Sequence, residues 1–231
     1  IINGSRDAFK GGWNKVKLYF MLGLPTETDE DAEGIALLSE KISEEYFETE
    51  AKEERVGSLQ ITASASYFVP KPFTPFQWAS MLPRDEYVRR ARHVKDTFNQ
   101  QLNKKRLKFA YHDQDISVLE AVFARGDRRL SKVIYDAYRD GAIFDAWTEF
   151  FDMERYYKAF AENGIDYKFY TERERGLDEV FPWDHLDAGV SKQFLMKEWQ
   201  AAKEGRVTSN CRDKCQGCGA AVFGSGVCFG K

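Results

Sequence analysis

The sequence lacks the features that mark secreted, membrane-spanning and intrinsically disordered proteins. No cysteine occurs among the first 210 of its 231 residues, whereas a disulfide-stabilised secreted protein distributes its cysteines through the fold. Uncharged stretches such as residues 56–70 are shorter than the ~18 to 20 apolar residues that a membrane helix needs. Apolar residues make up 43% of the chain and aromatic residues 15%, which is enough for a packed core and excludes disorder.

The chain also opens without an initiator methionine and without the basic and apolar regions of a secretory signal. We therefore expect it to be an excised piece of a longer protein. Neither sign of charge dominates, since 34 Lys and Arg residues face 37 Asp and Glu residues, for a formal charge of −3. A polyanion-binding role would thus need a local basic patch. No internal repeat and no low-complexity tract is present.

All four cysteines lie in the last 21 residues, as Cys211, Cys215, Cys218 and Cys228. Their spacing, C-x3-C-x2-C followed by a fourth cysteine, brings four thiolates within reach of one ion and predicts a metal site. Zinc and an iron–sulfur cluster both accept four thiolates, so the spacing leaves the metal open. The alternative is a tail with free thiols. Clustered thiols also favour a reducing compartment, and we expect a cytoplasmic protein.

Near the N-terminus the pattern predicts a strand, a helix and a second strand. Apolar residues alternate over residues 15–23, a helix start is indicated at Thr28 and Asp31, and a second alternating stretch covers residues 59–69. In that second stretch one side is apolar and the other carries small hydroxyl groups. A βαβ unit predicts parallel strands joined by a right-handed crossover, and the polar side is expected to face a cavity or a ligand.

The rest of the chain is expected to be mainly helical. Three prolines within residues 70–75 predict an ordered, irregular loop. A helix over residues 84–102, a short strand over 107–111, and helices over 116–124, 128–140, 144–162 and 191–204 are then expected. The sequence divides into a βα region over residues 1–83, a helical extension over 84–205 and a cysteine-rich tail over 206–231.

Two motifs resemble those of radical S-adenosylmethionine enzymes. The strand 15–22 leads into Gly23-Leu24-Pro25-Thr26-Glu27-Thr28 and an acidic helix start, which resembles a late barrel strand and turn of that family. Residues 62–78, with a Ser-x-Ser strand and a Pro-Lys-Pro-Phe-Thr-Pro-Phe-Gln-Trp loop, look like the next strand and its exit. Together the two cover about residues 10–80. The remainder, including residues 112–147 and 211–219, resembles a subfamily often joined upstream to a cobalamin-binding-type domain.

The resemblance implies α/β architecture: the C-terminal part of an incomplete (β/α)6 TIM-like barrel, followed by a mainly helical extension. It implies an upstream loop of three cysteines that holds a four-iron four-sulfur cluster, and cleavage of S-adenosylmethionine to a 5′-deoxyadenosyl radical. This stretch would then lack its own reaction centre, and no catalytic residue is assigned. The resemblance implies, position by position, that the cofactor-binding residues are Met21, Gly23, Ser64, Ser66 and Phe68. The alternative places Phe68 in the core and makes the serines small packing residues.

The cysteine tail has the spacing of the family's radical-generating motif but differs from it in two respects. It comes after the last predicted helix instead of after the first barrel strand, and Gln216 stands where the family motif usually has an aromatic residue. A fourth thiolate from Cys228 would close the coordination shell, and a closed site cannot bind substrate at the metal. We therefore expect a structural zinc site or an auxiliary cluster.

Other candidates carry less weight. His112, Asp113 and Asp115 follow a predicted strand, where barrel enzymes often place catalytic groups, although such residues are more often helix caps. His185 is expected in an aromatic packing corner, and Arg125, Arg128 and Arg129 could pair with phosphates. The aromatic residues of the extension are expected to form a helical core, with base stacking only where they are exposed: Tyr135, Tyr138, Phe144, Trp147, Phe150, Phe151, Tyr156 and Tyr157.

A second hypothesis is an RNA- or protein-binding module with a structural zinc site. Residues 84–108 carry nine basic residues against three acidic ones, which could contact phosphates of RNA, including tRNA. An amphipathic surface helix shows the same excess without a ligand. Half a barrel would also leave strand edges open, so self-association through these edges is expected.

Overall fold

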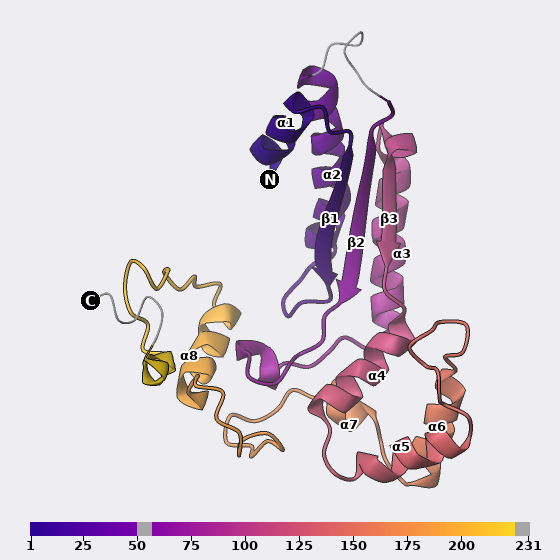
Figure 1. The fold of residues 1–231 in the computed structure, drawn as a ribbon, viewed down its shortest axis with the longest axis vertical. Coiled ribbons are helices and arrows are strands. Elements are labelled where there is room, and N and C mark those ends of the chain that lie inside the picture. Colours follow the sequence, from indigo (N-terminus) through magenta and orange to yellow (C-terminus); the bar gives the residue numbers. More distant parts are fainter. Residues whose placement is uncertain (50–56, 225–231) are drawn as a thin grey trace. The chain divides into compact units, whose positions relative to one another are not determined.

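The computed structural model describes residues 1–49 and 57–224 (Figure 1). The chain forms two compact units, which are described separately. Unit 1 comprises Ile1–Phe68 and Leu82–Ser117, and unit 2 comprises Val69–Met81 and Val118–Lys231. The α3 and β3 elements, which follow residue 83, therefore pack in the same unit as the first two strands.

Unit 1 is built on a three-stranded parallel sheet. Its strands are β1 (Lys15–Leu22), β2 (Gln60–Tyr67) and β3 (Leu107–Tyr111), in the order β1-β2-β3. Lys15 is paired with Gln60, and Ile61 with Leu107. The helix α2 (Asp29–Thr49) connects β1 to β2, and α3 (Arg84–Gln100) connects β2 to β3. The prediction of an α/β fold with parallel strands is confirmed.

The alternation predicted for the strands is also present. On β2, Ile61, Ala63 and Ala65 are completely buried, and the side chains between them are only half-buried. Small and β-branched residues suit this position, because the buried face of a parallel sheet must accept helices at close range. One face of the sheet is thus the core of unit 1.

Two helices near the N-terminus pack against each other. The helix α1 (Ile2–Lys10), which the sequence pattern did not reveal, places the Phe9 ring edge-on to Tyr46 of α2 at 5.1 Å between centroids. At the start of α2, the Asp31 N–H donates to Thr28 Oγ1 and the Thr28 N–H donates to the Asp31 carboxylate, as a capping box requires. These bonds from the Thr28 backbone and hydroxyl lower the pKa of Asp31.

The helix α3 contributes the expected apolar stripe. Tyr87, Ala91 and Val94 are fully buried, and Phe98 is 5% exposed. The Tyr87 ring stacks on Tyr67 of β2, with ring planes 5° apart. A short 3-10 turn, η2 (Lys104–Arg106), then leads into β3.

Unit 2 is helical. The loop 69–81 contains the 3-10 turn η1 (Pro75–Trp78), and the end of α4 (Gln114–Arg125) enters the unit. The remaining helices are α5 (Leu130–Arg139), α6 (Met153–Glu162), α7 (Lys168–Thr171), α8 (Lys192–Lys203) and the 3-10 turn η3 (Ala220–Phe223). The core is aromatic, with Trp78, Phe160, Tyr170, Phe181 and Trp199 all at most 3% exposed.

The predicted first residue of one helix is wrong. The helix expected over residues 144–162 begins at Met153, because Asp152 caps it by accepting the Glu154 N–H at 3.0 Å. The preceding segment forms turns. The aromatic residues expected in a helical core divide accordingly: Tyr156 is buried, whereas five are at least half-exposed, namely Tyr135, Tyr138, Phe144, Trp147 and Phe150.

Candidate functional site

One face of the unit 1 sheet is covered by helices, and the opposite face is open. We define the open face by the side chains that alternate with the buried ones: Lys15, Lys17, Tyr19 and Met21 of β1, Gln60, Thr62, Ser64 and Ser66 of β2, and Lys108 and Ala110 of β3. Tyr19 is 78% exposed and Met21 is 56% exposed. Two large side chains exposed on the face of a parallel sheet are unusual, even on the edge strand β1, since both faces of such sheets are normally buried.

The open face brings together three of the five residues expected to bind cofactor. Met21 lies directly beside Ser66 in the strand register, and Ser64 lies beside Tyr19. The Ser66 hydroxyl donates to the Phe20 carbonyl at 3.2 Å. Phe68 differs, because its side chain is only 4% exposed, as the core alternative requires, and its N–H extends the sheet by donating to Leu22 O.

Gly23, the fifth of these residues, belongs to a turn organised by Glu27. The Glu27 carboxylate accepts hydrogen bonds from the Gly23 N–H at 3.0 Å and from the Leu24 N–H at 3.4 Å. Gly23 has φ of +92°, and a Cβ there would approach Leu82 Cδ1 to 3.0 Å, so the turn requires glycine. Arg90 of α3 donates to Glu27 from the other side, at 2.8 Å. Sequence reasoning did not identify the role of Glu27.

The residues after β3 mostly serve the fold. Asp113 accepts the backbone N–H groups of Asp115 and Ile116 and thereby caps α4. Asp115 pairs with Arg84, with 3.0 Å between Oδ2 and Nη2. His112 is exposed, and its N–H donates to Ala65 O. The interpretation of these aspartates as cap and ion-pair residues therefore accounts for their contacts.

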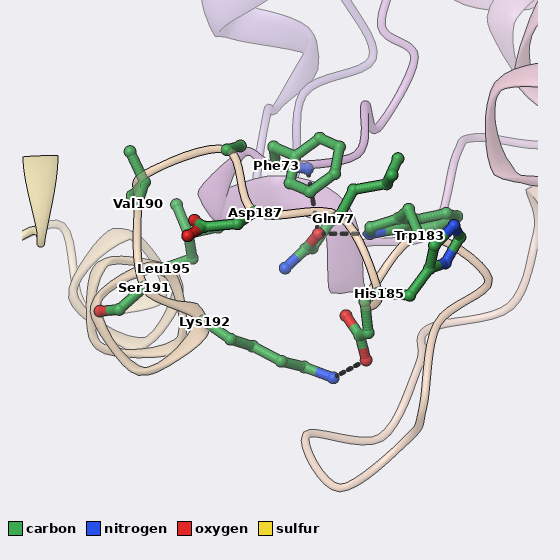
Figure 2. A pocket seen from close by; sticks show the side chains of 12 residues that line it. Phe73, Gln77, Trp183, His185, Asp187, Val190, Ser191, Lys192 and Leu195 are labelled. Carbon is green, nitrogen blue, oxygen red and sulfur yellow. Dashed lines mark hydrogen bonds and ion pairs between the residues drawn. The ribbon is translucent and has the colours of Figure 1, made fainter. Parts of the chain in front are cut away.

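Unit 2 contains a separate pocket of about 350 Å³ between η1 and the N-terminus of α8 (Figure 2). Its apolar lining includes Phe73, Trp183 and Leu195, and its polar lining includes Gln77, Asp187 and Lys192. His185, expected in a packing corner, is exposed at this pocket. Sequence reasoning missed the pocket because its two walls are about 110 residues apart in the chain.

The side chain of Gln77 is fixed in one orientation. Its Oε1 accepts from the Phe73 N–H at 3.1 Å and from the Trp183 indole N–H at 2.9 Å. Both partners are pure donors, so the amide oxygen must face them and the NH2 group must face the pocket. The residue is 2% exposed, and its Nε2, which has no hydrogen-bond partner in the described part of the chain, keeps contact with solvent.

Phe73 is held in a strained backbone conformation. Its φ is +58°, a region that bulky L-residues rarely adopt. The ring is half-exposed at the pocket. Strain of this kind costs ~1 to 3 kcal/mol and persists only where surrounding contacts impose it; here the bond from Phe73 N–H to Gln77 is one such contact.

The arginines that were expected to meet phosphates are placed differently. Arg125 is completely buried, and burial together with the charge of Arg175 lowers the pKa of Arg125 to about 9. Its guanidinium lies 3.5 Å from Thr171 O and 3.4 Å from Gln77 O. Arg129 pairs with Asp127 at 2.6 Å, and Arg128 is exposed. Arg125 therefore braces the η1 segment and is inaccessible to a phosphate.

The tail is described as far as residue 224. Cys211 and Cys215 are exposed free thiols, Cys218 is half-buried, and Cys228 lies outside the described residues. Within residues 1–49 and 57–224, no three His, Cys, Asp or Glu side chains are gathered around a common point. Cys218 is nevertheless anchored, because its carbonyl accepts the Ser191 N–H at 2.8 Å.

The surroundings of Cys218 suit a thiolate ligand. Gly217 and Gly219 both have positive φ, and the Ala220 N–H donates to Cys218 Sγ at 3.5 Å. Backbone N–H groups directed at sulfur stabilise bound thiolates and tune iron–sulfur clusters. The chemistry of the four cysteines thus fits either metal considered above.

Comparison with known proteins gives a distant relative. The chain is 28% identical over 169 residues to a curated protein of Methanocaldococcus jannaschii that is described as uncharacterized. The match covers 71% of this chain and 33% of the relative, so the chain spans about one third of the length of that protein. No family model and no solved structure matches the chain.

The helices are amphipathic or short. None of those in the described ranges combines the length and the apolar character that crossing a bilayer demands.

Proposed function

We propose that this chain is the C-terminal part of the barrel and the extension of a radical S-adenosylmethionine enzyme. Unit 1 would contribute three βα-type strands to an incomplete (β/α)6 barrel, with the open face directed to the interior. The observation that carries the proposal is the open face itself. Side chains alternate along the parallel strands, helices cover one face of the sheet, and Tyr19 and Met21 are exposed on the other face. A barrel interior accounts for such a surface, because it supplies both a cover and a ligand.

The residues of the open face suit the cofactor. The Met21 thioether offers an apolar, polarisable contact for an adenine ring. The Ser64 hydroxyl can donate to ribose or base, and the Ser66 hydroxyl, which donates to the Phe20 carbonyl, can accept from them. Gly23 lies directly after β1, in a turn that is held by the hydrogen bond from the Gly23 N–H to the Glu27 carboxylate. A reduced four-iron four-sulfur cluster supplies one electron when bound, which divides S-adenosylmethionine into methionine and the 5′-deoxyadenosyl radical.

The proposal assigns that cluster to a part of the full-length protein outside this chain. Cys211, Cys215 and Cys218 follow α8, not a barrel strand, and are proposed to hold zinc or an auxiliary cluster together with Cys228. A cobalamin-binding-type domain upstream is part of the same proposal, as is a cytoplasmic location, where thiolate ligands stay reduced. The outer edge of β1, unpaired among the described strands, is where another barrel strand or a second copy would add.

The test is formation of 5′-deoxyadenosine by the full-length protein, purified without oxygen and reduced with dithionite in the presence of S-adenosylmethionine. Met21→Ala and Ser66→Ala are expected to lower the yield at least tenfold and to raise the KM for S-adenosylmethionine. Lys17→Ala lies on the same face but nearer the amino end of β1, and is expected to leave both unchanged. Absence of 5′-deoxyadenosine from the wild-type protein would refute the proposal.

A second function, RNA binding, is favoured by a different surface. A cleft of about 510 Å³ at the amino ends of the strands is lined by Lys15, Lys105, Arg106 and Lys108, and no carboxylate among the described residues lines it. By contrast, Arg84, Arg89 and Arg90 of α3 pair with carboxylates. Three of the five Lys and Arg residues of α3 are therefore already paired, whereas the cleft gathers four basic side chains without a carboxylate in its described lining.

RNA retention by the chain should then fall steeply with salt, because phosphate contacts release counterions. The double change Lys105→Glu and Lys108→Glu is expected to abolish retention at low salt. The control Lys95→Glu, at an exposed position on α3, should preserve it. Equal retention by both variants would exclude the cleft as the binding surface.

A further inference from the structure

We propose that the pocket of unit 2 binds a guanine base, with Gln77 and Asp187 reading its Watson–Crick edge. This inference goes beyond the proposed function and does not rest on it, because every residue involved belongs to unit 2 and none is assigned to the barrel. The base could come from a free nucleoside or from a nucleotide of RNA; the chemistry of recognition is the same.

The amide of Gln77 gives the pocket a hydrogen-bond donor. Two donors fix its oxygen, at 3.1 Å from the Phe73 N and 2.9 Å from the Trp183 Nε1, so its NH2 group is the pocket's donor. Figure 2 shows the amide nitrogen directed into the cavity and away from Trp183. The residue is 2% exposed, and its Nε2 is not one of the fully buried polar atoms without a partner, so water in the pocket reaches this N–H and a ligand that displaces the water has to supply its own acceptor. The ligand must therefore offer an acceptor such as a ring carbonyl.

Asp187, an exposed residue, adds a carboxylate to the lining of the pocket. Its Oδ1 accepts the Gly189 N–H at 2.7 Å, which fixes the side chain beside the pocket. No cation pairs with it in the described part of the chain. The nearby Lys192 is occupied, since its ammonium donates to Asp184 at 2.5 Å and to Glu179 O at 2.8 Å. The site therefore calls for neutral N–H donors and disfavours an anionic group.

The shape of the pocket also suits a planar base. Phe73 presents a half-exposed ring to the pocket at the expense of a strained backbone, and aromatic side chains are the platforms on which bases stack. The volume of about 350 Å³ lies near the lower end of the range of ligand sites. A planar ring system with its sugar fits this space better than an extended cofactor.

Guanine matches this set of groups. It carries a carbonyl acceptor, O6, next to two donors, the ring N1–H and the exocyclic amine. The amide N–H of Gln77 would meet O6, and the two oxygens of Asp187 would meet the two donors. Adenine, cytosine and uracil each present only one donor beside their acceptor, so each leaves one carboxylate oxygen without a ligand partner.

The test is titration calorimetry of the full chain with guanosine, adenosine, cytidine and uridine. Guanosine is expected to bind at least tenfold more tightly than the other three. Gln77→Glu keeps an acceptor for Phe73 and Trp183 but removes the donor, and should weaken guanosine binding at least tenfold. Gln193→Glu makes the same charge change at an exposed site on α8 and should have no effect. Equal binding of all four nucleosides, or none at millimolar concentration, overturns the proposal.

A change of specificity provides an independent check. Asp187→Asn keeps an acceptor for the Gly189 N–H but replaces one acceptor by a donor. Xanthosine has a carbonyl where guanosine has its exocyclic amine, so this variant should prefer xanthosine over guanosine, reversing the order of the wild-type chain. Unchanged preference overturns the role of Asp187.

The source of the base is distinguished with a short single-stranded RNA containing one guanosine. Tighter binding than guanosine, lost with Gln77→Glu, assigns the site to RNA; equal binding assigns it to a free nucleoside. RNA binding that Gln77→Glu leaves intact, with no binding of guanosine, would be phosphate recognition and would refute the base pocket.

Discussion

Glu27 and Arg90 form a nearly buried ion pair, with 2.8 Å between Oε1 and Nη1 and exposed side-chain fractions of 8% and 10%. Arg90 also donates to the Glu27 carbonyl at 3.1 Å, so one guanidinium holds both the backbone and the side chain of the turn after β1. The pair therefore links α3 to the carboxyl end of the first strand. This contact gives the Gly-Leu-Pro-Thr-Glu-Thr motif a structural role in addition to any role in cofactor binding.

Removing one partner of this pair should be strongly destabilising. Arg90→Met leaves the Glu27 carboxylate buried without its cation, and we expect a loss of ~3 to 5 kcal/mol in the free energy of unfolding, measured by urea denaturation. Arg92→Met removes an exposed arginine two positions along α3 and serves as the control. Similar losses for the two variants would contradict the importance of the pair.

Phe73 allows strain and side-chain function to be separated. Phe73→Gly and Phe73→Ala both remove the ring, but glycine adopts φ of +58° without a Cβ penalty. The glycine variant is therefore expected to be more stable than the alanine variant by ~1 kcal/mol, read from chemical denaturation. Both variants should lose nucleoside affinity equally. Equal stability of the two variants would mean that the backbone at this position is unstrained.

A pH dependence is expected from the pair of Glu179 with Arg173. The guanidinium donates to both carboxylate oxygens, at 2.7 and 2.8 Å, and these hydrogen bonds lower the pKa of Glu179. A lowered pKa in the folded state gives stability that is present above the unfolded-state value of ~4.3 and lost as pH falls through the folded-state value. Partial exposure limits the contribution to at most ~1 kcal/mol.

The measurement compares wild type with Glu179→Gln over a series of acidic pH values. The variant should be less stable at neutral pH, and the difference should disappear once the pH falls below the lowered folded-state pKa of Glu179, where both side chains are uncharged. Glu162→Gln, at an exposed residue on α6, is the control and should show no such convergence. A difference that stays constant with pH would rule out the ion pair as its cause.

Metal content tests the tail. Protein purified without oxygen is expected to contain either zinc alone or iron with acid-labile sulfide, and Cys218→Ser should lose it, because three thiolates hold such a metal far less tightly than four. Ser80→Ala, at an exposed residue of the loop 69–81, should retain the metal. Iron with sulfide would support an auxiliary cluster, and zinc would make the tail a structural site. Metal-free wild-type protein would leave the cysteines as free thiols.

The sequence by itself determined the local features of this protein. Alternation identified β1 and β2, Thr28 and Asp31 identified the start of α2, and the stripe from Tyr87 to Phe98 identified the buried face of α3, because each depends on neighbours within a few residues. It also placed Ser64 and Ser66 together on the polar side of the second strand. The incomplete barrel, the cofactor and the metal stay predictions.

Only the tertiary structure decided what joins distant segments. The helix α6 begins at Met153 because Asp152 caps it there, whereas the aromatic residues over 144–152 had predicted an earlier start. Trp147 lies before this start and is exposed. The ion pair of Glu27 with Arg90 spans 63 residues, and the bond between Gln77 and Trp183 spans 106. Such contacts leave no periodic trace in the sequence, since long-range packing and not local preference selects their partners.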